Sequence, residues 1–258
     1  MIQMLDCQKM IENISVVIIT KNASSTIGTT LETLKDFKEI IIYDSGSTDS
    51  TLDIIKSYKN AFLYSGDFFG FGDTKNHALS LASNDWIFSL DADESLSNEL
   101  IKSLIDLKLE PKLVGQVLRK NFFMGMEMNS SGWNRDTIIR LFNRNDFCFS
   151  KLKVHEKVEV DSSAKVIDLR GYINHLAITK LSQTLDKANL YSELYASENK
   201  TVYPLIIILM KAHFAFFRTY FLQKGFLNGW RGFVLAFSNS VGVFYKYIKI
   251  YAKHKTKK

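Results

Sequence analysis

The stretch DWIFSLDADES, residues 85–95, decides the fold. It joins an apolar run, residues 86–90, to three carboxylates, Asp91, Asp93 and Glu94, that lie within four positions. A short apolar run bounded by polar residues is typical of a strand buried on both faces. Like charges at the edge of a core are unfavourable unless a cation holds them. The sequence therefore predicts a buried strand whose end meets a cation.

The segments around this stretch alternate between strand and helix patterns. Continuous β-branched runs predict buried strands at residues 14–20 and 39–44, and AFLYS, residues 61–65, predicts a third, shorter strand. Segments with helical spacing or an N-capping Ser, Thr or Asp predict helices at residues 26–37, 47–58, 73–83 and 97–107. This alternation favours a doubly wound α/β fold, in which a mostly parallel sheet carries helices on both faces.

The pattern changes after Pro111. Short strand patterns separated by turns predict a mixed or antiparallel continuation of the sheet, and residues 181–200 have the spacing of an amphipathic helix. We therefore expect one domain over residues 1–200, with halves 1–110 and 111–200, followed by a helical extension over residues 201–258.

The charge of the chain is unevenly distributed. Residues 201–258 contain ten Lys and Arg and no Asp or Glu, which leaves 23 basic and 27 acidic residues in 1–200. Residues 201–258 also hold 14 of the 33 aromatic residues. A basic and aromatic segment suits an anionic surface, either lipid headgroups or nucleic acid. The alternative is that its aromatic residues pack on the domain while its lysines face water.

The apolar segment 205–222 carries two cations and a histidine. A membrane-spanning helix needs roughly 20 mainly apolar residues, so this composition favours a helix lying at headgroup level over a span. The N-terminal residues contain no pattern of a signal peptide, and the two cysteines, Cys7 and Cys148, have neither a CxxC nor a metal-ligand spacing. Both observations favour a cytoplasmic protein with reduced thiols.

Polar clusters follow each of the four predicted strands. They lie at residues 20–22, 43–49, 70–76 and 90–94. In doubly wound sheets ligands bind at the carboxyl ends of the strands, so we expect the clusters to converge on one crevice. The segment DSGSTD, residues 44–49, lacks the glycines and lysine of dinucleotide and P-loop motifs. It suits either a ribose or base contact or a plain capped turn.

Asp91 and Asp93 form a more specific signal. Two carboxylates at positions i and i+2 of a strand end can hold one divalent cation and leave positions open for diphosphate oxygens. The alternative is an acidic helix N-terminus, since the helix expected at residue 97 follows closely. Glu94 either reaches toward an acceptor or favours the dipole of that helix.

Four segments resemble the successive blocks of family 2 glycosyltransferases with the GT-A fold: SVVIITKN (15–22), EIIIYDSGSTDST (39–51), GFGDTKNHAL (70–79) and DWIFSLDADE (85–94). Later segments resemble the bacterial subgroup that adds glucose or a similar hexose to the heptose of the lipopolysaccharide inner core. They are RLF (140–142), VHEKV (154–158), KANLYSELYA (187–196) and QKGFLNGWRGF (223–233).

The resemblance implies an inverting transfer from a UDP-sugar that depends on Mg²⁺ or Mn²⁺. The residues it assigns to the nucleotide-sugar are Thr20, Asn22, Asp44, Ser45, Lys75 and Asp91. Those it assigns to the metal are Asp93 and Asp91, with His155 or His175 completing the shell. Many relatives have an acidic pair in the acceptor half that this chain lacks, so Glu156 is the first candidate for the general base and Asp136 the second.

The expected partners are the nucleotide-sugar donor, a lipid-linked oligosaccharide acceptor and an anionic membrane surface, and not nucleic acid. The enzyme would then work peripherally on the cytoplasmic face of the inner membrane. A transferase acting on another glycan and a sugar nucleotidyltransferase are the alternatives. The second is less favoured, because Lys21 is the one basic residue in the first loop, TKNASST (20–26). The net negative charge of residues 1–200 argues against a nucleic-acid-binding protein. The sequence does not distinguish among glucose, galactose and N-acetylated sugars as the sugar transferred.

Overall fold

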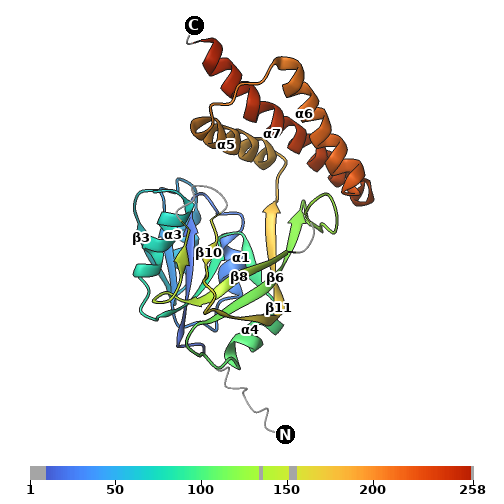
Figure 1. Ribbon diagram of the computed structural model, residues 1–258. Helices are drawn as coiled ribbons and strands as arrows, with labels where there is room; N and C mark the ends of the chain where they lie inside the picture. The colour runs from blue at the N-terminus through green and yellow to red at the C-terminus, as the bar shows by residue number, and fades with distance from the viewer. Residues whose placement is uncertain (1–9, 134–135, 151–155, 257–258) are drawn as a thin grey trace. The chain divides into compact units, whose positions relative to one another are not determined.

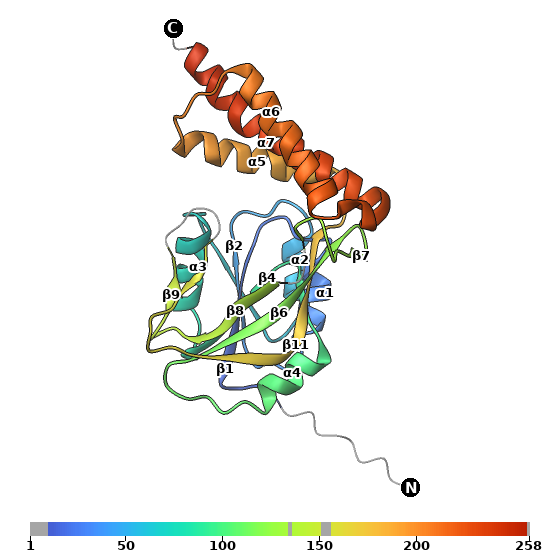
Figure 2. The same cartoon turned by 45° about the vertical axis from the view of Figure 1, so that its right-hand side comes forward.

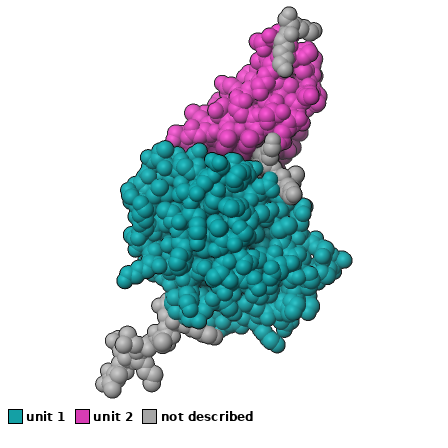
Figure 3. Space-filling view, turned by 90° about the vertical axis from the view of Figure 1, so that its left-hand side faces the viewer, with its two compact units in different colours: residues 1–119, 136–175 teal, residues 120–135, 176–258 magenta. Residues whose placement is uncertain are grey.

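The computed structural model describes residues 10–133, 136–150 and 156–256 of the chain. The chain divides into two compact units (Figure 3). The first unit comprises residues 1–119 and 136–175, and the second comprises residues 120–135 and 176–258. Each unit has its own core and is described separately below.

Four parallel strands form one half of the sheet in the first unit (Figure 1). They are β1 (Ile14–Thr20), β2 (Ile40–Asp44), β3 (Ala61–Ser65) and β4 (Trp86–Asp91), in the spatial order β3-β2-β1-β4. All five residues of β2 are buried, as the continuous apolar run predicts. The chain reverses its direction of growth at β1, which is the topological switch point of a doubly wound sheet.

Helices cover both faces of these strands (Figure 2). They are α1 (Ile27–Glu32), α2 (Thr51–Lys56), α3 (Phe71–Ser80) and α4 (Asn98–Ile105). Side chains alternate along a strand, so Val16 and Ile18 share one core with α1, α2 and α4, whereas Val17 packs with α3 on the other face. The expected doubly wound α/β arrangement is confirmed.

The other half of the sheet is antiparallel. Beyond β4 the strand order is β8 (Asp136–Asn143), β6 (Leu113–Phe123), β11 (Lys165–Ile178) and β5 (Glu94–Leu96). The short strand β7 (Met126–Glu127) pairs with β6, whereas β9 (Cys148–Phe149) and β10 (Val158–Glu159) form a separate two-stranded sheet. β8 pairs antiparallel with β4, and β11 places His175 opposite Glu94 on β5. This confirms the expected continuation and brings residues from distant parts of the chain beside Asp91.

The second unit consists mainly of helices. They are α5 (Ser182–Glu198), α6 (Leu205–Phe217), the π-helical turn η1 (Arg218–Leu222), the 3₁₀ turn η2 (Gly225–Asn228) and α7 (Gly229–Lys255). α7 packs against both α5 and α6. Ser240 on α7 donates a hydrogen bond of 2.8 Å to the carbonyl of Ala212 on α6, which fixes the two as an antiparallel pair. The expected C-terminal helical extension is confirmed.

This helical unit begins earlier than the expected boundary at residue 200. Lys249 on α7 reaches back to α5, where its Nζ lies 2.8 Å from Ser192 Oγ and 2.8 Å from Glu193 Oε1. The segment 120–135 also joins the unit, since Ser131 donates a backbone hydrogen bond of 2.8 Å to Gln223. Among the described residues, one helical segment, Leu205–Leu222, is long and apolar enough to cross a membrane by length and composition alone.

Candidate active site

Three of the predicted site residues end neighbouring strands. Thr20 closes β1, Asp44 closes β2 and Asp91 closes β4. Thr20 lies opposite Asp44, and Ile19 lies opposite Asp91, so the three residues share one edge of the sheet. Ser45 donates its backbone N–H to the carbonyl of Thr20 at 2.9 Å, which joins the first two strand ends directly. The predicted convergence of these strand ends is therefore present.

The loops after β1 and β2 are fastened to each other. The amide of Asn22 donates to Ser47 Oγ, and Asn22 Oδ1 accepts from the amide of Thr48, each at 2.8 Å. The carboxylate of Asp44 accepts from the amides of Gly46 and Ser47, each at 2.9 Å. Gly46 has a φ of +88°, a conformation that glycine adopts without strain. Asp44 is almost completely buried and holds this turn in shape.

Asp49 provides a second fastening between the same loops. Its carboxylate accepts from the amide of Ser24 at 3.2 Å and from the amide of Thr51 at 3.1 Å. Burial acts to raise the pKa of Asp49, but the hydrogen bonds from Ser24 and Thr51 outweigh it and lower the pKa to about 2. The edge of the sheet thus carries a preformed pair of loops.

Thr20 has a hydroxyl without a partner among the described residues. Its side chain is buried, and Oγ1 lies within the strand-end cluster. Buried hydroxyls nearly always form a hydrogen bond, so a buried hydroxyl that lacks a partner requires an explanation. A ligand held at the ends of β1 and β2 would supply the missing partner.

Lys75 connects the strand ends to the acceptor half of the chain. It lies on α3, its side chain is 5% exposed, and its Nζ lies 2.9 Å from Asp91 Oδ1 and 2.8 Å from Glu156 Oε1. Arg140 on β8 donates to the other oxygen of Asp91 at 2.8 Å. Each carboxylate oxygen of Asp91 is therefore held by a cation of the protein.

Glu94 extends this network in the other direction. Its side chain is 0% exposed, and the Arg140 guanidinium lies 2.6 Å from Oε1. Arg119 on β6 lies 3.5 Å from the same oxygen and forms a two-point contact with Asp136, at 3.1 and 2.7 Å. A chain of alternating charges therefore runs from Glu156 through Lys75, Asp91, Arg140, Glu94 and Arg119 to Asp136. The two candidates for the general base lie at its opposite ends.

The ionisation of this network follows from its geometry. Burial acts to raise the pKa of Asp91, but Arg140 and Lys75 hold it well below its usual range. Burial acts to lower the pKa of Lys75, but Asp91 and Glu156 raise it above its usual value. The pKa of Arg140 is also raised, because Asp91 and Glu94 outweigh its burial. These three groups are charged at neutral pH.

These contacts show what holds the carboxylates of the opening stretch. Arg140 and Lys75 neutralise Asp91, and Arg140 with Arg119 neutralises Glu94. The helix N-terminus takes no part in this, because Ser97 caps α4 by accepting from the amide of Leu100 at 3.2 Å. Glu94 neither caps that helix nor reaches an exposed surface. The third carboxylate, Asp93, has a different neighbour.

Asp93 lies beside His175. Its Oδ2 is 3.5 Å from Nε2 of His175 on β11. His155 lies outside the described residues. Within the described ranges, no three His, Cys, Asp or Glu side chains come together in a metal-binding arrangement, so Asp91 does not join this pair as a third ligand. A carboxylate and an imidazole suit Mn²⁺, and the carboxylate also suits Mg²⁺. Asp93 and His175 thus fit part of a metal shell whose other positions are left for a diphosphate and water.

The sequence motifs assign no role to Arg119 or Arg140. A signal was present, because Arg140 stands inside the apolar strand DTIIRLF, residues 136–142, where its side chain is buried. A buried arginine requires a carboxylate partner. Which carboxylate it meets depends on the antiparallel pairing of β8 with β4, which no local pattern specifies.

The comparison with protein families agrees with this fold and site. The model of glycosyl transferase family 2 matches residues 15–158, which include every strand end described above. The chain belongs to glycosyltransferase family 2 and is therefore a glycosyltransferase.

The chain is also similar to individual proteins. The chain is 30% identical to the lipopolysaccharide core biosynthesis glycosyltransferase LpsC of Rhizobium meliloti, over 95% of this chain and 94% of LpsC. It is 27% identical to an uncharacterized glycosyltransferase of Rickettsia typhi, over 86% and 81% of the two chains. Among solved structures it is similar to S. aureus TarS 1–349 in complex with UDP-GlcNAc, with 14% identity, a TM-score of 0.44 and coverage of 95% and 92%.

Proposed function

We propose that the enzyme transfers a hexose, namely glucose from UDP-glucose, with inversion to a heptose of a lipopolysaccharide core. The similarity to LpsC over nearly the full length of both chains supports the acceptor class. Membership of family 2 supports transfer from an activated sugar. The choice of glucose is supported by the resemblance of the segments 140–142, 187–196 and 223–233 to enzymes that add glucose or a similar hexose.

One observation carries the mechanism: Lys75 contacts Asp91 at a strand end and Glu156 at the same time. Asp91 belongs to the edge where doubly wound sheets bind ligands. Glu156 belongs to the half of the chain that we expect to receive the acceptor. A single buried ammonium group therefore holds a donor-side carboxylate next to the proposed base.

The donor would lie along the ends of β1, β2 and β4. Thr20 has a buried hydroxyl that lacks a partner among the described residues, and it would hydrogen-bond the nucleoside. The loops of Asn22 and Ser45, shaped by Asp44, would form the wall against which the base and ribose pack. Lys75 adds a positive charge beside the expected diphosphate. Asp91 acts here by orienting Lys75 and Arg140.

Asp93 and His175 would hold the divalent cation. When bound, that cation offsets the negative charge that develops on the departing UDP. The neighbouring Asp91 is paired with Lys75 and Arg140, which supports assigning the metal to Asp93 in preference to Asp91. We propose Mg²⁺ or Mn²⁺ as the ion.

Glu156 would take the proton from the acceptor hydroxyl as that oxygen attacks the anomeric carbon. A positioned carboxylate within hydrogen-bond reach is sufficient for this step. Attack on one face of the sugar and departure of UDP from the other give inversion, with no covalent enzyme intermediate. Asp136 is the weaker candidate, because both of its oxygens accept hydrogen bonds from Arg119.

The test is a transfer assay with purified enzyme. UDP-glucose, UDP-galactose and UDP-N-acetylglucosamine are each offered with a core oligosaccharide that ends in heptose, in Mg²⁺, in Mn²⁺ or in EDTA. We expect a β-linked glucosylated product from UDP-glucose that is absent in EDTA. Transfer from another donor, or to a core lacking heptose, would refute the proposed specificity. The same core without heptose is the control.

A further inference from the structure

The outer side of α6 is covered with large apolar side chains that face away from the rest of its unit. The exposed residues are Leu205, Ile206, Leu209, Met210, Phe214 and Phe217. Their spacing follows the helical period, so they form one continuous stripe. The opposite side packs on α7 through buried Ile208, Ala212 and Ala215. An ordinary surface helix has the reverse arrangement, with polar residues outward.

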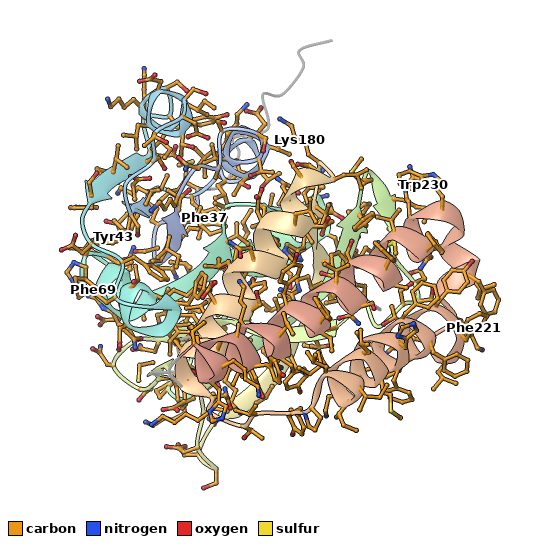
Figure 4. All side chains as sticks on the ribbon, turned by 90° about the horizontal axis from the view of Figure 1, so that it is seen from above. Phe37, Tyr43, Phe69, Lys180, Phe221 and Trp230 are labelled. Atoms are coloured by element: carbon orange, nitrogen blue, oxygen red, sulfur yellow. The ribbon has the colours of Figure 1, made fainter. Side chains whose placement is uncertain are left out.

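The stripe continues around the turn that joins α6 to α7. The exposed residues here are Phe221, Leu222, Phe226, Leu227 and Trp230, with Leu227 67% exposed. Figure 4 shows Phe221 and Trp230 at the same end of the helix pair. Ring contacts of Tyr220 with Phe221, Phe226 and Phe233 connect η1, η2 and α7. We call the stripe and this turn together the apolar edge. A contiguous exposed patch of this kind marks an interaction surface.

The charged residues of the chain segment that forms the apolar edge are all basic. Residues 201–258 contain ten Lys and Arg and no acidic residue. Arg218, Lys224 and Arg231 flank the turn, and Arg231 stacks on Trp230 at 4.7 Å. Cations together with aromatic residues, and without acidic residues, are typical of segments that lie on anionic lipid. The charge pattern therefore favours a bilayer over a second protein.

Two further lysines of the helical unit, one on α6 and one on α7, lie over tyrosine rings. Lys211 lies over the rings of Tyr203 and Tyr247, and Lys246 lies over Tyr195. No carboxylate of the described residues forms an ion pair with either lysine. Two lysines held by tyrosine rings alone present positive charge to an anion such as a lipid phosphate.

The position of the cations decides how the edge would enter the bilayer. A hairpin inserted with its turn first would carry Arg218, Lys224 and Arg231 into hydrocarbon, which is costly. A hairpin lying flat keeps these three at headgroup level while the stripe of α6 faces the acyl chains.

We propose that the α6–α7 hairpin is an in-plane membrane anchor whose apolar edge inserts into the headgroup–acyl boundary of an anionic bilayer. The anchor rests on the proposed function in one respect, since it gives the enzyme access to a lipid-linked acceptor. Insertion of apolar side chains, rather than charge alone, provides its affinity. The binding should therefore persist in high salt, which screens surface charges.

The test uses the full-length protein and vesicles of phosphatidylethanolamine and phosphatidylglycerol. We expect co-sedimentation that survives high salt and is reduced about tenfold or more in F217S/F221S/L227S. The matched control is L185S/L190S, which removes two exposed apolar residues from α5 in the same unit and should bind as wild type. Equal binding by both variants, or loss of wild-type binding in high salt, would overturn the proposal. So would a dimer, seen in solution without lipid, that the triple variant abolishes.

Trp230 reports the depth of insertion. Vesicles should shift the tryptophan emission to shorter wavelength, and lipids brominated near the headgroup end of the acyl chain should quench it more than lipids brominated near the end of the chain. W230F should lose most of both effects, because Trp86 belongs to the first unit and Trp133 packs against Phe123 in the core of the helical unit. Stronger quenching by deep bromines would indicate a span and contradict an in-plane anchor.

Transfer to a delipidated core acceptor should be the same in wild type and F217S/F221S/L227S. Loss of wild-type transfer in that assay would refute the proposed function, and intact transfer without vesicle binding would refute only the anchor.

Discussion

Lys75 Nζ lies 2.8 Å from Glu156 Oε1, although the two residues are separated by 81 positions in the sequence. Lys75 comes from α3, and Glu156 comes from the segment between β9 and β10. The same ammonium group also contacts Asp91. Through this lysine, a group in the nucleotide-sugar half of the expected domain is held against a group in the acceptor half.

Replacing Lys75 should affect both stability and activity. Lys75→Met removes one of the two cations that contact Asp91 and also the ammonium group that contacts Glu156. Breaking a buried ion pair costs about 3 kcal/mol. We expect urea unfolding to show a loss of this order. Lys75→Arg should recover most of the stability. The exposed Lys56→Met on α2 is the control and should leave the midpoint unchanged. A wild-type midpoint for Lys75→Met would show that the network does not stabilise the fold.

Glu94 should be a structural member of the network. Its carboxylate is fully buried between Arg140 and Arg119, so Glu94→Gln leaves two guanidinium groups with one fewer negative charge. Removing one partner of a buried pair costs about 3–5 kcal/mol. The matched control is Glu99→Gln on the exposed side of α4, which should change stability by less than about 0.5 kcal/mol. Equal midpoints for the two variants in denaturant unfolding would contradict this role.

Asp49 should make stability depend on acid pH. Its folded-state pKa of about 2 lies below its unfolded value near 3.8. Its contribution is therefore fully present above about pH 4 and is lost as the pH falls toward 2. The difference in unfolding free energy between wild type and Asp49→Asn should shrink over that interval. Thermal unfolding at several pH values measures it. A difference that stays constant from neutral pH down to pH 2 would exclude this linkage.

The sequence was sufficient for much of this fold. The strands at 14–20 and 86–91 match their apolar runs, because burial on both faces imposes that pattern. The strand at 61–65 was also predicted, but it lies at the edge of the sheet with Phe62 and Tyr64 exposed. Helix ends were less predictable. The helix predicted to reach Phe37 ends at Glu32, because Leu34 and Phe37 enter the core from the following turns. Apolar spacing reports burial, and a buried turn gives the same signal as a helix.

The candidate site was predictable where it depends on strand ends and not where it depends on pairing. Thr20, Asp44 and Asp91 follow parallel strands, so their convergence could be expected from topology. Arg119 and Arg140 reach the site because β6 and β8 join the sheet antiparallel, in a register that the sequence does not display. From the sequence, the cation beside Asp91 was therefore expected to be a metal. In the structure, Arg140 and Lys75 contact this carboxylate.

Metal binding should depend on Asp93. Titration with Mn²⁺ in the presence of UDP, followed by electron paramagnetic resonance, should show a bound ion in wild type. Asp93→Asn should weaken this binding by about tenfold or more while its unfolding midpoint stays close to wild type, since its side chain is partly exposed. His175→Ala should weaken binding to a smaller degree. Unchanged Mn²⁺ affinity in Asp93→Asn would move the metal to other residues.

The identity of the general base is the central claim, and one kinetic comparison tests it. Glu156→Gln and Asp136→Asn are matched changes, each removing one carboxylate charge at opposite ends of the same network. The measurement is kcat for glucose transfer from UDP-glucose to a heptose-terminated core, with UDP affinity measured in parallel. We expect Glu156→Gln to reduce kcat by roughly 10²–10⁴-fold at unchanged UDP affinity, and Asp136→Asn to keep kcat within about tenfold of wild type. Near-wild-type kcat in Glu156→Gln, or the larger loss in Asp136→Asn, would contradict the account.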